Sequence, residues 1–238
     1  ILSSAKSKTP LLLIFMTVFI DLMGFGLVIP ILPTYAQQLQ ASDFMVGLLI
    51  ASYSIMQFLF TPFWGRLSDR IGRRPVLLIS LAASLAGYLI WGFSTSLIWL
   101  FASRIVAGFG NANIAVAQAY IADITTKENR ARGMGMVGAA FGLGFVLGPA
   151  LGCLLVQNGL GFVGFVAAGF SLVDSVLTFF LLPEPKERGS FGNDRFGLGI
   201  DFYIKNVTSA KLRISFLIFF VSTFAFANME ATLVLLTS

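Results

Sequence analysis

Three ionisable residues, Asp21, Arg104 and Glu230, lie inside long apolar stretches of the sequence. An unpaired charge in apolar surroundings costs on the order of several kcal/mol, so such residues mark candidate functional sites. Burial would favour the neutral form of the Asp21 carboxyl group and a nearby arginine such as Arg104 would favour its charged form, so the electrostatic coupling that we expect between the two would make protonation sensitive to conformation. The alternative is a static ion pair with a structural role. Glu230 is a second candidate for carrying a proton.

Four uncharged polar residues also fall in apolar stretches: Gln57, Asn111, Asn113 and Gln118. Their amides are candidates for hydrogen bonds to a small-molecule substrate. The alternative is polar contact between neighbouring helices. Asp174 is a further acid in an apolar stretch. Because it lies near the basic end of its segment, we expect its carboxyl group to reach water.

The composition places these residues in a membrane protein. Hydrophobic residues make up 57% of the 238 residues and charged residues only 11%, whereas a soluble domain carries about 25% charged residues. A spanning helix needs about 20 mostly apolar residues. Seven runs meet this requirement: 11–33, 44–64, 75–94, 97–121, 133–156, 161–182 and 212–236. The sequence therefore predicts an all-α membrane protein, in which the last run is separated from the first six by a long polar linker.

The basic residues define the orientation of these segments. Fifteen of the sixteen Lys and Arg residues fall before the first run or near 65–74, 122–132 and 183–213, with Arg104 the exception. Basic loops stay in the cytoplasm, so we expect the N-terminus to be cytoplasmic. The pI near 9.6 is explained by this topology, and nucleic acid is not an expected partner.

Several function classes are disfavoured. The chain has no histidine and a single cysteine, Cys153, so it lacks the residues of the commonest metal sites and offers no internal disulfide. No G-x-x-x-x-G-K-[ST] phosphate-binding pattern and no catalytic serine motif occur. We expect neither an enzyme nor a bound cofactor or metal.

The segment GRLSDRIGRR at residues 65–74 concentrates charge between two apolar runs. Gly65 and Gly72 would permit a tight connection between antiparallel helices. Asp69 can cap backbone N–H groups. Arg70, Arg73 and Arg74 would lie at the cytoplasmic rim. For a generic basic loop, the simplest interpretation is an anchor that fixes topology.

The spacing of this segment resembles the G-x-L-[SA]-D-R-x-G-R-R signature of the major facilitator superfamily. DLMGFGLVIPILP at 21–33, RIVAGFGNANIAVAQAYIADIT at 104–125 and LLPEP at 181–185 are also similar to patterns of that family. Residues 135–153 resemble the antiporter motif G-x8-G-x3-G-P-x-x-G-G. The matching positions are Gly135, Gly144, Gly148, Pro149 and Gly152, with Cys153 in place of the last glycine. This motif is typical of twelve-helix drug–proton antiporters, which include tetracycline efflux proteins.

The resemblance implies roles for these residues. The first and fourth helices would line a central cavity, with Arg104 taking part in proton coupling. Asp69, Arg73 and Asp123 would form a charge relay that holds the outward-facing state closed at the cytoplasm. The resulting cytoplasmic gate comprises Gly65, Asp69, Arg70, Gly72, Arg73, Arg74 and Asp123. The fifth helix would pack against the eighth, and the alternative is small-residue packing within the first bundle.

The resemblance also implies a domain organisation. We expect a cytoplasmic N-terminus at 1–10, a six-helix bundle at 11–182, a cytoplasmic linker at 183–211 and a seventh helix at 212–238. The seventh helix would begin a second bundle, so we expect the chain to be a fragment or a truncated product. The missing bundle, or less favourably a second copy of the chain, would complete the cavity.

The leading functional interpretation is proton-coupled efflux of amphipathic small molecules by alternating access, in a bacterial inner membrane. Protons, the substrate and lipid are the expected partners. Within transporters, the alternative is a proton-coupled metabolite or sugar carrier. The alternative from another class is a non-transporting half or a membrane scaffold, which the length of the chain favours.

Overall fold

A computed structural model describes residues 2–111 and 113–185, together with positions 214, 217–218, 220–222 and 224–225. The chain divides into two compact units, residues 1–189 and residues 190–238. In the second unit the described positions are helical. Glu230 and most of the predicted seventh helix lie outside the described residues.

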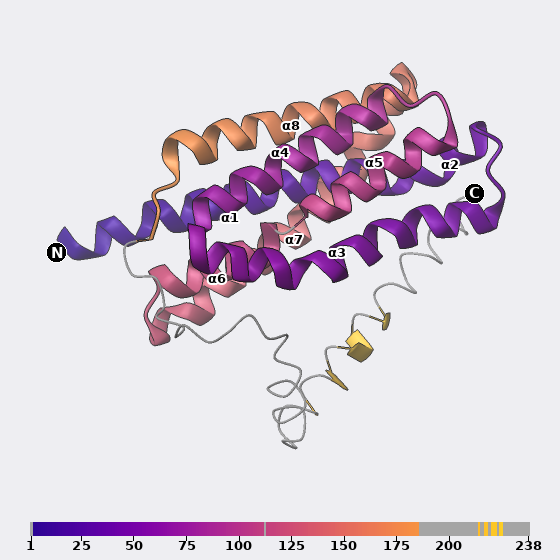
Figure 1. The fold of residues 1–238 in the computed structure, drawn as a ribbon. Helices are drawn as coiled ribbons and strands as arrows, with labels where there is room; N and C mark the ends of the chain where they lie inside the picture. Colours follow the sequence, from indigo (N-terminus) through magenta and orange to yellow (C-terminus); the bar gives the residue numbers. More distant parts are fainter. Residues whose placement is uncertain are drawn as a thin grey trace. The chain divides into compact units, whose positions relative to one another are not determined.

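The described part of the first unit is a bundle of α-helices (Figure 1). The elements are α1 (Leu2–Val28), η1 (Ile29–Ile31), α2 (Leu32–Gln38), α3 (Asp43–Ile71), α4 (Arg73–Gly92), α5 (Leu97–Gly110), α6 (Asn113–Ile124), α7 (Lys127–Leu155), η2 (Val156–Asn158) and α8 (Leu160–Leu181). They form six stretches long and apolar enough to cross a membrane: Pro10–Gln38, Asp43–Ile71, Arg73–Gly92, Leu97–Ile124, Glu128–Asn158 and Leu160–Leu181. The all-α membrane fold predicted from the sequence is confirmed.

Helix packing leaves an apolar outer surface. α1 packs against α7 and α8, α4 packs against α5 and α8, and α3 packs against α5. α1 and α8 run antiparallel (Figure 1). Large apolar side chains point outward, including Phe58 at 80% and Phe180 at 75% exposure. Such a surface would aggregate in water but suits lipid. The protein is therefore an integral, multi-pass membrane protein.

The charged segment 65–74 differs from the predicted loop. α3 continues to Ile71 and α4 begins at Arg73, so Gly72 alone breaks the helical path. Gly65 therefore lies inside α3 and serves no turn, and a side chain there would meet open space. The helix continues because Arg66, Leu67 and Arg70 are good helix formers and no proline follows until Pro75.

The predicted segment 97–121 is interrupted between α5 and α6. The last carbonyls of α5 are bonded from neighbouring helices: Trp64 Nε1 donates to Phe109 O at 2.6 Å, and Ser80 Oγ donates to Gly110 O. Two glycines at 108 and 110 also weaken helix propensity here. The interruption therefore leaves buried carbonyl groups satisfied by side chains of α3 and α4.

The core consists of two apolar clusters with polar residues between them. One cluster includes Ile14, Trp64 and Tyr120, and the other includes Leu27, Trp91 and Val163. Buried polar side chains lie between the two clusters along the helices: Asp21, Ser80, Ser84, Ser103, Arg104, Asn111, Asn113, Ser171 and Asp174. We call this set the polar layer.

Candidate functional site

The turn between α3 and α4 is built around Gly72. Its φ is +112° and its ψ is 157°, a backbone conformation that is essentially restricted to glycine. A Cβ at this position would lie 2.5 Å from Glu184 Oε1. Glu184 is that close because its two carboxylate oxygens accept from the backbone N–H groups of Arg73, at 2.7 Å, and Arg74, at 2.9 Å.

Glu184 therefore caps the N-terminus of α4 from a position just beyond α8. Carboxylates are favoured there because the first N–H groups of a helix have no partner within the helix. The sequence analysis assigned no role to Glu184. The only local signal is its place between Pro183 and Pro185, which stop the helix and leave the carboxylate free to turn back.

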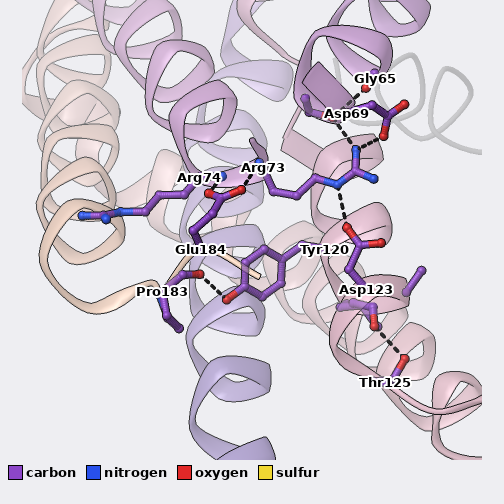
Figure 2. A network of polar contacts seen from close by, with 12 residues as sticks. Gly65, Asp69, Arg73, Arg74, Tyr120, Asp123, Thr125, Pro183 and Glu184 are labelled. Carbon is purple, nitrogen blue, oxygen red and sulfur yellow. Dashed lines mark hydrogen bonds and ion pairs between the residues drawn. The ribbon is translucent and has the colours of Figure 1, made fainter. Parts of the chain in front are cut away.

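Arg73 joins three helices at this end of the bundle (Figure 2). Its guanidinium contacts Asp69 Oδ1 on α3 at 2.6 Å and Asp123 Oδ2 on α6 at 2.9 Å. It also donates to Ser68 Oγ at 2.6 Å. Arg73 is 8% exposed, so water screens these contacts less than it would on an open surface. The predicted relay residues are thus in direct contact, and Ser68 is an addition to them.

The end of α8 is fastened to the same site. Arg74 Nη2 donates to the Phe179 carbonyl, and its guanidinium lies 5.5 Å from the centre of the Phe179 ring. Tyr120 Oη donates to Pro183 O at 2.7 Å, as Figure 2 shows. Arg70 lies in the last turn of α3 on an exposed face. We call the contacts of Asp69, Arg73, Asp123 and Glu184 the Arg73 network.

Asp21 and Arg104 both lie in the polar layer, at 3% and 2% exposure. Among the residues that the structure describes, the ion pairs do not include one between them. Arg104 stacks over the Trp91 ring at 4.8 Å, and its Nε lies 3.4 Å from Ser103 Oγ. The hydroxyls of Tyr53 and Tyr88 interact electrostatically with both Asp21 and Arg104. Asp21 and Arg104 therefore share two tyrosine neighbours without forming an ion pair in this conformation.

The four candidate amides are in different environments. Asn113 is fully buried beside the Asp21 carboxyl group, although its side-chain atoms do not reach hydrogen-bond geometry. Asn111 is buried and donates to Tyr53 Oη. Gln57 is half-buried on α3, and Gln118 is exposed on α6. The asparagines therefore belong to the polar layer with Asp21, and Gln118 lies on a different face.

Asp174 is buried, contrary to the expectation that it reaches water. It is 0% exposed and lies among the small and polar residues of α8 that face the bundle. The sequence carries a signal for this burial, because Gly164, Ala167 and Ser171 precede it at helical spacing. The exposure of Asp174 is therefore decided by the face of α8 on which it lies, and not by its distance from the end of the segment.

The antiporter motif forms a close contact between α7 and α1. A Cβ on Gly148 would lie 2.7 Å from Gly26 Cα, and one on Gly144 would lie 2.8 Å from Leu22 Cβ. Gly152 likewise lies against Leu27 O. Gly135 faces open space, Pro149 lies inside α7, and Cys153 is exposed. Three motif positions thus pack against α1 within the bundle, and the expected contact with an eighth helix stays a prediction.

Comparison with known proteins supports the family of the chain. The sequence profile of the Major Facilitator Superfamily matches residues 14–237. The chain is 45% identical over 183 residues to the class C tetracycline resistance protein of Escherichia coli, covering 75% of this chain and 46% of that protein. It is 33% identical over 227 residues to multidrug resistance protein 1 of Bacillus subtilis, covering 95% and 58%.

Solved structures agree with this comparison. The human organic anion transporter MFSD10 has a TM-score of 0.66 at 30% identity, covering 75% of this chain and 48% of that chain. A bacterial homologue of the human lysosomal transporter Spinster has the same TM-score at 16% identity, which shows the fold alone. The chain spans about half the length of these relatives. Since the family profile covers nearly the whole chain, the protein belongs to the major facilitator superfamily.

Proposed function

We propose that the chain is the N-terminal half of a proton-coupled exporter of amphipathic small molecules, such as tetracycline, that works by alternating access. The observation that carries this proposal is the buried polar layer, in which Asp21 lies 3% exposed inside a membrane-spanning bundle. A carboxyl group held there can take up or release a proton only when conformation admits water. This is the property that couples proton movement to a change of access.

The Arg73 network supports a gate at the cytoplasmic end. The positive-inside rule assigns the cytoplasm to the side that carries Arg70, Arg73 and Arg74. Arg73 binds α3 and α6 through carboxylates, and Glu184 binds the start of α4. Opening this end would separate Arg73 from its carboxylate partners. The closed state is therefore favoured until another interaction offsets the free energy of that separation.

The domain organisation belongs to the same proposal. Residues 11–182 form the first bundle, 183–211 form a cytoplasmic linker, and 212–238 begin a second bundle that completes the substrate cavity. Asn111 and Asn113 supply hydrogen bonds from the first bundle, and Glu230 is a further proton-carrying candidate. The names of the relatives, which include tetracycline and multidrug resistance proteins, support an amphipathic substrate and a bacterial inner membrane.

Proton coupling is tested with proteoliposomes that contain a pH-sensitive dye. Purified chain is reconstituted, a proton gradient is imposed, and tetracycline is added. We expect drug-dependent proton movement in the wild type and its loss in Asp21→Asn, because an amide cannot carry the proton. The matched control is Asp43→Asn, which changes an exposed acid at the start of α3. Equal proton movement in both variants would contradict the assignment of Asp21.

A second measurement separates binding from transport. Tetracycline binding by the chain is followed through quenching of tryptophan fluorescence, since Trp64 and Trp91 lie on either side of the polar layer. Binding without proton movement would assign the chain a substrate-binding half that needs the second bundle to transport. Absence of both would count against an exporter of this substrate class.

A further inference from the structure

Asp174 is the buried acid that the mechanism above does not use. Its side chain is fully buried, and neither carboxyl oxygen reaches hydrogen-bond geometry with a described residue. The hydroxyls of Thr17 on α1 and Thr178 on α8 lie beside it. These two hydroxyls hydrogen-bond each other at 3.2 Å across the interface between α1 and α8.

The register of these helices brings Asp174 to the level of Asp21. α1 and α8 are antiparallel (Figure 1), and the contact between Thr17 and Thr178 fixes their alignment. Asp21 comes one turn after Thr17, and Asp174 comes one turn before Thr178. The two carboxyl groups therefore stand at the same height, on the faces of α1 and α8 that carry the contact between Thr17 and Thr178.

Among the described residues, the ion pairs do not include one with Asp21 or Asp174. Two of the helices that pack against α8 carry described ionisable side chains. These are Asp21 on α1 and Tyr88, Arg73 and Arg74 on α4. Arg73 is held by Asp69 and Asp123, and Arg74 by the Phe179 carbonyl and ring. η2 carries no ionisable residue, and the described charged side chains of α7, Glu128, Arg130 and Arg132, are exposed in its first turns.

Arg104, the buried cation of the polar layer, lies over the Trp91 ring and forms an ion pair with neither acid. Two neighbouring carboxylates without an ion-pair partner cannot both remain ionised in such a site. Desolvation penalises each charge, and the like charges repel each other. We propose that Asp21 and Asp174 form a proton-sharing carboxyl pair, in which Asp174 holds the proton in this conformation. Transfer within the pair breaks the O–H bond of Asp174 and forms one on Asp21. The pair then keeps one proton and one negative charge throughout.

This inference extends the proposed proton coupling and rests on it only for its role in transport. Asp174 is the member of the pair that holds the proton away from water, because it is fully buried between α1 and α8. Asp21 is the member nearest to the candidate substrate amides, since it lies beside Asn113. The ionised Asp21 can therefore accept the proton held on Asp174, which leaves Asp174 ionised in its place.

Infrared spectroscopy tests the pair without requiring transport. The 238-residue chain in lipid nanodiscs is measured at neutral pH, where the C=O stretch of a protonated carboxylic acid is separate from carboxylate bands. We expect this band in the wild type, in Asp21→Asn and in the control Asp43→Asn, and its loss in Asp174→Asn. A wild type without the band, or a band that persists in Asp174→Asn, would overturn the pair.

Two further variants guard against misfolding and against a purely structural role. Asp174→Glu keeps the acid, so we expect a band at a displaced frequency, and an unchanged frequency would contradict the assignment. Thr178→Val removes a hydroxyl beside the acid, so we expect the band to move to higher frequency without loss. A band in Thr178→Val identical to the wild type would count against a protonated acid at this place.

The transport arm distinguishes this inference from the proposed function. In proteoliposomes, Asp174→Asn is expected to abolish drug-dependent proton movement, while Asp43→Asn retains it. A wild type that shows the band but neither moves protons nor binds tetracycline overturns the proposed function and supports the carboxyl pair. A wild type that transports, with unchanged transport in Asp174→Asn and no band, overturns the pair and supports the function.

Discussion

At the scale of single residues, the site depends on one backbone conformation and one distant carboxylate. Gly72 lets α4 start immediately after α3 ends, and Glu184 occupies the space that a Cβ at residue 72 would need. This arrangement places Arg73 within reach of Asp69 and Asp123. Residue 72 must therefore be glycine, whereas residue 65 need not be. A pair of substitutions can test this difference.

Gly72→Ala is expected to lower the free energy of unfolding by about 1–3 kcal/mol, because alanine is strained at this φ and displaces Glu184. Gly65→Ala is the matched control. It is expected to raise the free energy of unfolding by about 0.5–1 kcal/mol, since residue 65 lies inside a helix with open space beside it. Chemical unfolding in detergent, followed by circular dichroism, measures both. Similar losses in the two variants would argue against a helical 65–71.

At the scale of helices, α1 is the element on which the candidate sites converge. It carries Asp21 and Thr17, and it packs against both α7 and α8. The approach to α7 is close because Gly26 meets Gly148 with no side chains between them. Any widening of this contact would move α1 relative to α8 and so disturb the level shared by Asp21 and Asp174.

Gly148→Ala is expected to destabilise the bundle by about 1–3 kcal/mol, because the added methyl group would overlap Gly26. Gly142→Ala on the open face of α7 is the control and is expected to be neutral or stabilising by up to about 1 kcal/mol. Thermal unfolding in the same detergent compares them. Equal melting temperatures would show that α1 and α7 separate without cost.

At the scale of the whole molecule, charge distribution determines how the bundle lies in the membrane. Asn129 in the first turn of α7 and Asn158 in η2 are both exposed, and they mark opposite ends of one span. In a Cys153→Ser background, we expect an impermeant maleimide to label Asn158→Cys in intact cells and Asn129→Cys only after permeabilisation. The reverse pattern would invert the proposed orientation.

The sequence predicted the six spanning helices because long apolar runs identify such helices by length alone. It predicted the residues that meet at Arg73 through their resemblance to a family signature. It did not predict the role of Glu184, which lies more than one hundred residues from its partners and contacts them only in the folded bundle. The burial of Asp174 was missed because helical face, rather than position along the segment, decides exposure.

The cap on α4 has a mechanical consequence. Glu184 lies immediately before Pro185, just after the last helix of the first bundle. The chain just before Pro185 is held by two hydrogen bonds from the backbone of Arg73 and Arg74 to Glu184 and by one from Tyr120 to Pro183 O. A load applied to the chain at Pro185 would therefore act directly on the first turn of α4, through the residue that caps it.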